Sequence, residues 1–217
     1  DGPMTHYQHD YFVTRAPRIG DNEYLRTPQK LAYVRVFDHF ASRQNRSHAI
    51  VTLPTGVGKT GLMALLPYGI ATGRVLIVTP QLVIRDRVAD SLDPDYVDNF
   101  WVKQKVFDRM KDLPVLVEYD RVISDEILSL ANIVVVNIQK LQARLTSSLI
   151  NRVPQDFFDM VIIDEAHHST ADTWVEVLQY FSQAKVVKLT GTPYRSDGRP
   201  IVGEVVYSYR LSAAMAN

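Results

Sequence analysis

The sequence has no cysteine, which excludes disulfide bonds and metal sites built from thiolates. Such a composition fits a reducing compartment, so we expect a cytoplasmic protein. An excess of charge of one sign is also missing, because 24 basic residues balance 24 acidic ones. The protein as a whole therefore has no basic field, and a polyanionic partner must contact a local patch.

Long apolar runs are absent as well. The longest, Leu62 to Ala71, contains Pro67 and is shorter than the roughly 20 residues of a membrane-spanning helix, so we expect no membrane partner. We find no signal-peptide pattern, internal repeat or low-complexity tract. With 217 residues, 46% of them hydrophobic, the chain can fill the core of one large domain or two small ones.

Short runs rich in Val and Ile recur along the chain, and stretches of helical character lie between them. Uninterrupted apolar runs of this length are typical of strands buried on both faces. We predict strands at 49–53, 74–78, 132–136, 160–163, 185–189 and 201–207, and helices at 28–43, 59–66, 81–91, 122–130, 139–149 and 173–182. This alternation predicts an α/β fold with a mostly parallel, doubly wound sheet and flanking helices.

Two stretches lack this regularity. Residues 1–23 mix His, Tyr, Asp and Pro without periodicity and are expected to form an irregular lead-in, after which Thr27 is predicted to cap the first helix. Residues 92–121 are the least regular part. Within them NFWVKQKVF (99–107) interleaves aromatic residues with lysines, a pattern that would suit single-stranded nucleic acid. We favour the simpler interpretation that these aromatic side chains pack against the core.

The stretch LPTGVGKTG (53–61) lies between a predicted strand and a predicted helix. Gly56 and Gly58 can adopt backbone angles closed to other residues, so the chain can wrap closely around an anion. Lys59 can reach the β- and γ-phosphates of a nucleotide, and the Thr60 hydroxyl can bind Mg²⁺. The usual pattern has a glycine where this chain has Leu53. The alternative is a glycine-rich turn with a chance lysine.

A second polar group follows the apolar strand of MVIIDEAHH (160–168). Asp164 would lie at the carboxyl edge of the sheet and hold Mg²⁺, and Glu165 would act as general base on the attacking water. One alternative is a solvated acidic turn. Another is a metal site built from Asp164, His167 and His168.

These motifs, in this order, resemble the first RecA-like motor domain of superfamily 2 helicases and translocases, P-loop NTPases. Within that group the chain is similar to the DEAD/DEAH-box relatives that include the motor subunits of ATP-dependent type I and type III restriction enzymes. The resemblance covers residues 24–210. It rests on LRTPQ (25–29, Q motif), PTGVGKT (54–60, Walker A), VTPQLVIRDR (78–87, motif Ia), NIQKL (137–141, motif Ib), DEAH (164–167, motif II, Walker B) and LTGTPYR (189–195, motif III).

The resemblance implies a role for each matching residue. Catalysis would use Lys59, Asp164, Glu165 and His167, and Mg²⁺ would bind Thr60 and Asp164. ATP would be contacted by Arg26, Gln29, Thr55, Gly56, Val57, Gly58, Lys59 and Thr60. Thr190 and Thr192 would couple the nucleotide state to domain movement. The strand that ends in these threonines would lie between the Walker A and Walker B strands.

The same resemblance implies a track for one nucleic-acid strand, with DNA favoured over RNA. The matching residues offer amides, hydroxyls and a few cations, which suit the phosphate backbone. They are Thr79, Pro80, Gln81 and Arg85 in motif Ia, Asn137, Gln139 and Lys140 in motif Ib, and Arg195 at the end of motif III. For Arg85 a solvated helix face is the alternative.

The leading hypothesis is therefore an ATP-hydrolysing helicase or translocase that uses Mg²⁺ and acts on DNA. The resemblance also implies a second RecA-like domain, towards which residues 211–217 would begin a linker, and admits a nuclease or specificity partner. A nucleotide-gated interaction module that does not unwind strands is an alternative, as is a motor subunit of a restriction or defence complex. A small-molecule kinase is disfavoured by the Asp-Glu pair.

Overall fold

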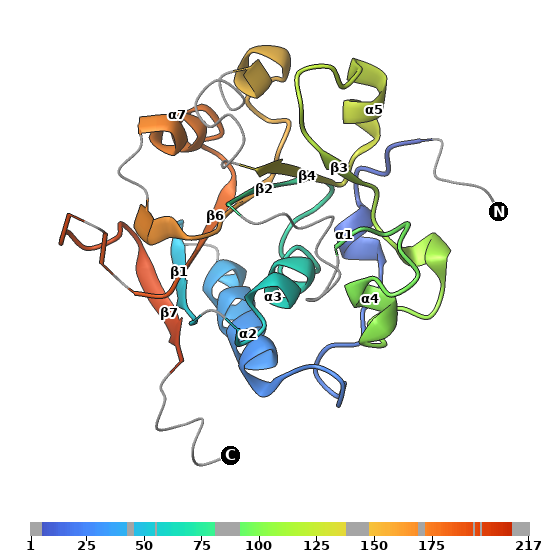
Figure 1. Cartoon of the computed structure of the whole chain (residues 1–217), viewed down its shortest axis with the longest axis horizontal. Helices are drawn as coiled ribbons and strands as arrows, with labels where there is room; N and C mark the ends of the chain where they lie inside the picture. The colour runs from blue at the N-terminus through green and yellow to red at the C-terminus, as the bar shows by residue number, and fades with distance from the viewer. Residues whose placement is uncertain are drawn as a thin grey trace.

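Seven parallel strands form one sheet in the order β3-β4-β2-β5-β6-β1-β7 (Figure 1). The computed structural model describes residues 6–42, 46–54, 56–80, 92–137, 148–168, 172–192, 194–195 and 197–209, with the backbone alone at 168 and 172–174. The strands are β1 (Ala49–Thr52), β2 (Val75–Thr79), β3 (Leu116–Glu118), β4 (Ile133–Asn137), β5 (Met160–Ile163), β6 (Lys185–Thr190) and β7 (Glu204–Ser208).

Helices cover both faces of this sheet. They are α1 (Tyr11–Thr14), α2 (Thr27–Ala41), α3 (Lys59–Leu65), α4 (Phe100–Lys103), α5 (Asp125–Leu130) and α7 (Asp172–Tyr180), with short 3₁₀ helices η1 (Met110–Asp112) and η2 (Ala166–His168). In Figure 1, α1 to α4 lie on one side of the sheet and α5 and α7 on the other. Among the described helices, none is long and apolar enough to cross a membrane.

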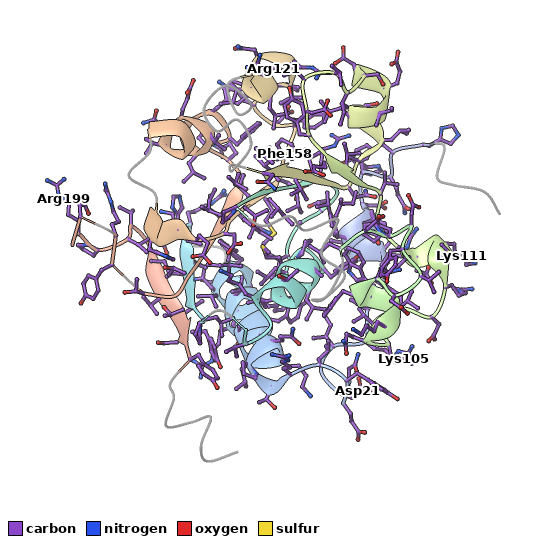
Figure 2. All side chains as sticks on the ribbon, in the orientation of Figure 1. Asp21, Lys105, Lys111, Arg121, Phe158 and Arg199 are labelled. Carbon is purple, nitrogen blue, oxygen red and sulfur yellow. The ribbon has the colours of Figure 1, made fainter. Side chains whose placement is uncertain are left out.

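Each central strand contributes side chains to two separate cores, because successive residues of a strand point to opposite faces. In β2, Val75 and Ile77 pack with α2 and α3, whereas Leu76 and Val78 pack with α5 and α7. Phe158, labelled inside the molecule in Figure 2, packs edge-on against Phe181 in the second core, whereas the labelled charged residues Asp21, Lys111 and Arg199 lie at the surface. The predicted α/β class is therefore confirmed, as is burial on both faces for β1, β2, β4 and β5, whereas the edge strand β7 is largely exposed.

The boundaries differ from the predictions in several places. Helix α2 has Arg26 rather than Thr27 as its N-cap, because the Gln29 side chain accepts a hydrogen bond from the Arg26 backbone at 2.9 Å. A three-residue edge strand, β3, lies in the stretch expected to be irregular. The predicted helix 81–91 falls outside the described residues. So does most of 139–149, where residues 148–152 are helical.

The expected lead-in is part of the core. Tyr11 and Phe12 of α1 are fully buried. The Tyr11 hydroxyl lies 2.7 Å from that of Tyr68 and donates to the Asp112 carbonyl at 2.6 Å. Backbone bonds from Phe12 to Thr72 and from Gly69 to Phe12 fix α1 to the segment after α3. The four-residue helix α1 was not predicted, and the rest of the described residues 6–23 contain no helix or strand, as expected of an irregular segment.

The aromatic residues of 99–107 also pack inward, as the simpler interpretation predicted. Phe100, Trp101 and Phe107 are buried, and the Trp101 indole donates to the Ala64 carbonyl at 3.2 Å. Asn99 caps α4 by accepting from Val102. The aromatic rings of this segment therefore stabilise α3 from outside and are not available to stack on nucleic acid bases.

Gly61 in α3 is packed too closely for a larger residue. A Cβ at this position would lie 2.5 Å from the Phe100 ring and would also meet the Gln29 amide. We expect Gly61→Ala to destabilise the fold by about 1–3 kcal/mol because it overpacks the core, although alanine is the better helix former. Denaturant unfolding measures this change. Gly20→Ala is the control, since nothing lies within 4 Å of its added Cβ, and equal stability of the two variants would contradict the prediction.

Lys188 of β6 is a buried cation on the face of α5 and α7. Only 4% of the residue is exposed, and its ammonium donates to the Val202 carbonyl at 2.8 Å. Burial lowers the pKa of Lys188 from 10.5 to about 8. Burial, together with the Lys188 charge, lowers the pKa of the nearby His48 to about 4. The folded protein therefore binds the Lys188 proton less tightly than the unfolded chain does.

This shift predicts a pH dependence of stability. Between about pH 8 and pH 10.5 the unfolded chain keeps the Lys188 proton and the folded one releases it, so the contribution of Lys188 to the free energy of unfolding rises with pH. Lys188→Met removes this contribution, and we expect the variant to show a flatter rise than the wild type. Thermal unfolding across this pH range measures the difference. The exposed Lys103→Met should keep the wild-type slope, and an unchanged slope in Lys188→Met would contradict the prediction.

Candidate active site at the carboxyl edge of the sheet

Three neighbouring strands bring the predicted site residues together. Strand β6 lies between β5 and β1, as the resemblance implied for the strand ending in Thr190. Because all three strands are parallel, the glycine-rich loop after β1, the acidic pair after β5 and the end of β6 meet at one edge. The order of the strands in the sheet is thus sufficient to bring the three segments of the site together.

The loop after β1 depends on its two glycines. Gly56 and Gly58 have φ angles of 90° and 92°, in the left-handed region that favours glycine. Gly58 is the N-cap of α3, and Lys59 is the first residue of that helix. A Cβ on Gly58 would collide with the Gln29 amide. Thr55 lies outside the described residues.

The beginning of α2 supports this loop. Arg26 donates to the Gly56 carbonyl at 2.6 Å, and the Gln29 amide donates to the Gly58 carbonyl at 3.0 Å. Gln29 is buried rather than exposed on its helix. Arg26 and Gln29, the two α2-side residues predicted to contact the nucleotide, therefore contact the glycine-rich loop directly, a link that the sequence spacing alone did not reveal.

Lys59 is held by both acidic residues. Its ammonium lies 2.9 Å from the Asp164 carboxylate and also contacts Glu165, and the lysine side chain is only 3% exposed. Burial alone would lower the pKa of Lys59, but the charges and hydrogen bonds of the two acids raise it above its ordinary value. The lysine is therefore protonated, and its ammonium lies between the ends of β1 and β5.

Asp164 uses both carboxylate oxygens. One oxygen faces Lys59 and accepts from the Glu165 backbone at 2.9 Å, and the other accepts from the Thr79 hydroxyl at 2.7 Å. Burial raises the pKa of Asp164, an effect opposed by Lys59 and Thr79. Glu165 follows with φ 57°, a left-handed conformation that is uncommon for a residue with a side chain. Strained residues of this kind cluster at functional sites.

A line of contacts continues from Glu165 to the end of β6. The second Glu165 oxygen lies 3.2 Å from Nε2 of His167, whose Nδ1 lies 2.8 Å from the Thr190 hydroxyl. Thr190 in turn donates to the Thr192 carbonyl at 2.6 Å. When Thr190 donates to Thr192, its hydroxyl is the acceptor for His167, so an imidazole that carries hydrogen on both nitrogens satisfies every contact.

The residues predicted to contact nucleic acid are only partly described. Thr79 and Asn137 end the adjacent strands β2 and β4 in register, and both are buried. Arg195 forms an ion pair with Asp197 at 3.0 Å. Gln81, Arg85, Gln139 and Lys140 lie outside the described residues. Contacts of this whole set with nucleic acid, and of Thr60 with a metal, stay predictions.

The alternative metal site gains no support from the described part of the chain. There, no group of three or more His, Asp or Glu side chains is arranged to hold a metal ion. Both ring nitrogens of His167 already face Glu165 and Thr190. The His168 side chain is outside the described set.

Comparison with known proteins identifies the fold and the family of this chain. The family described as "Type III restriction enzyme, res subunit" matches residues 22–195. The EcoAI endonuclease subunit, a type I restriction enzyme of Escherichia coli, is 39% identical over 66 residues, which are 28% of this chain but only 8% of that subunit. The UvsW helicase of bacteriophage T4 superposes on this chain with a TM-score of 0.54 at 17% identity, and the match covers 94% of this chain and 70% of the UvsW chain. A second UvsW structure matches with the same TM-score and identity, over 40% of its own length. The likeness to UvsW shows the RecA-like fold, and the family match covers most of the chain, so the chain belongs to the type III restriction enzyme res-subunit family.

Proposed function

We propose that this chain is the ATP-binding motor domain of a DNA helicase or translocase that hydrolyses ATP with Mg²⁺. The observation that carries the proposal is the 2.9 Å contact between the Lys59 ammonium and the Asp164 carboxylate at adjoining strand ends. A triphosphate needs a cation and backbone amides on one side and a metal-binding acid on the other. The carboxyl edge of this sheet offers both.

The side chains present fit ATP and Mg²⁺. The Asp164 carboxylate and the Thr60 hydroxyl are oxygen donors of the kind that Mg²⁺ prefers, and they come from the two sides of the site. Gly56 and Gly58 leave the loop backbone open to phosphate oxygens. Bound Mg²⁺ would neutralise the negative charge that develops on the transferred phosphoryl group.

The contacts of Lys59 suggest how the general base is controlled. Glu165 faces Lys59 with one oxygen and His167 with the other, so neither oxygen is ready to take a proton from water. Phosphate oxygens would draw the Lys59 ammonium away from the acids. Glu165 would then be free to accept the proton of the attacking water, with His167 still orienting its carboxylate.

Nucleic acid would lie beside this site. The residues that match motifs Ia and Ib follow β2 and β4, on the other side of β5 from the phosphate loop. We infer that the substrate is DNA, because the family is that of a restriction enzyme. The contact line from Glu165 through His167 to Thr190 would couple the nucleotide to motif III, and Thr192 would extend it.

A second candidate is a nucleotide-gated module, or a motor subunit of a restriction or defence complex, that does not separate strands. The tie between Lys59 and Glu165 is compatible with it, because a binding switch also needs a nucleotide-sensitive contact. Strand-displacement and translocation assays on the natural protein distinguish these functions. The presence of Glu165 as a general base favours hydrolysis over binding alone.

The proposal predicts the effect of removing the general base. Glu165→Gln should reduce ATP turnover by at least about a hundredfold, because the amide does not accept the proton of water. ATP binding should persist or tighten, since a neutral side chain releases Lys59 more readily. ATP turnover of the natural protein with and without DNA, and binding of a fluorescent ATP analogue, measure the two effects. The exposed Glu176→Gln is the control, and equal turnover in wild type and Glu165→Gln would reject the proposal.

We also propose that a second RecA-like domain completes the site. Arginine fingers from such a domain are worth about a thousandfold or more in rate. The 217-residue chain alone should therefore bind ATP weakly and hydrolyse it slowly, with little stimulation by DNA. Turnover assays on this chain and on the natural protein test the expectation, and rapid DNA-stimulated hydrolysis by the chain alone would contradict it.

A further inference from the structure

Thr79 was predicted to contact nucleic acid, but its hydroxyl points into the site. The residue ends β2 and is fully buried, and its hydroxyl donates to the Asp164 carboxylate at 2.7 Å. A buried hydroxyl without a hydrogen-bond partner is costly, so this contact fixes the orientation of the threonine as well as that of the acid.

The sheet itself creates this contact. Val78 pairs with Ile163, and the Asp164 backbone donates to the Val78 carbonyl at 2.8 Å, so the ladder between β2 and β5 extends one residue further. Thr79 and Asp164 therefore follow the last paired residues on adjacent strands. Their separation is set by backbone hydrogen bonds and does not depend on a flexible loop.

The two oxygens of Asp164 have different kinds of partner. Lys59, on the first oxygen, is the cation that phosphate would draw away. Thr79, on the second, belongs to a strand that is paired on both sides, with β4 and with β5, and is not part of a loop. Once Lys59 has moved, the Thr79 hydroxyl would remain to hold the carboxylate in one orientation.

We propose that Thr79 is a positioning residue that orients Asp164 for the magnesium ion of the nucleotide, an inference that rests on the proposed function. Groups that hold a metal-binding side chain in this way change metal affinity by about 10- to 100-fold when they are removed. Thr79 does not touch the metal or the nucleotide. It acts through the orientation of Asp164.

The test compares Thr79→Val, which keeps the shape and removes the hydroxyl, with Thr79→Ser, which keeps the hydroxyl. We expect Thr79→Val to raise the Mg²⁺ concentration for half-maximal binding of a fluorescent ATP analogue about tenfold or more. Its affinity for the analogue without Mg²⁺ should stay at the wild-type value, and Thr79→Ser should keep the wild-type Mg²⁺ dependence. The half-saturating Mg²⁺ for ATP turnover of the natural protein should shift in the same direction.

Thr52 provides a matched control. It ends β1 at the same edge of the sheet and is also buried, yet its hydroxyl has no hydrogen-bond partner in the described part of the chain. Thr52→Val should leave the Mg²⁺ dependence unchanged. If Thr79→Val does not fold, Thr79→Ala against Thr79→Ser isolates the hydroxyl, because the two variants lack the same methyl group.

Each outcome has a distinct meaning. A wild-type Mg²⁺ dependence in Thr79→Val, or in Thr79→Ala, overturns the role of Thr79 and leaves the proposed function standing. A Thr79 variant that raises only the half-saturating DNA concentration shows that Thr79 acts on nucleic acid. This result also overturns the proposed positioning role. Absence of Mg²⁺-dependent nucleotide binding in the wild type rejects the proposed function itself.

Discussion

The site depends on one buried ion pair, between Lys59 at the start of α3 and Asp164 after β5. Two charges removed from water are costly, and their attraction offsets this only with good geometry and further hydrogen bonds. Thr79 and the Glu165 backbone provide such bonds to Asp164. The pair thus needs β1, β2 and β5 in the order the sheet gives them, and removing Lys59 would leave the buried charge of Asp164 uncompensated.

An ion pair of this kind also keeps the site in a resting arrangement. Lys59 is bound to the same acids that would serve the metal and the water, so its charge is already compensated before any ligand arrives. Under the proposed function, the negative triphosphate would take the place of the acids at Lys59, and its metal ion would take the place of Lys59 at Asp164. The glycine loop, supported by Arg26 and Gln29, supplies the backbone around that exchange.

Much of the fold was predictable, because short valine- and isoleucine-rich runs that alternate with helical stretches can be recognised from the local sequence alone. The position of the glycine-rich loop and that of the acidic pair were predictable for the same reason: each is a contiguous motif after a strand. Contacts between distant segments were not. Nothing local in the sequence shows that Thr79 faces Asp164 or that Arg26 contacts Gly56. Strand β3 was missed because three residues on a sheet edge carry too little pattern, and it is fixed by pairing with β4.

The packing of α1 bears on where this domain begins. The family match starts at residue 22, yet Tyr11 and Phe12 fill space beside Tyr68 and hydrogen-bond to the chain after α3. A recombinant protein cut at the edge of the family match would lose these rings and expose the apolar surface they cover, close to the helix that begins at Lys59. The packed core therefore includes residues that lie before the start of the family match.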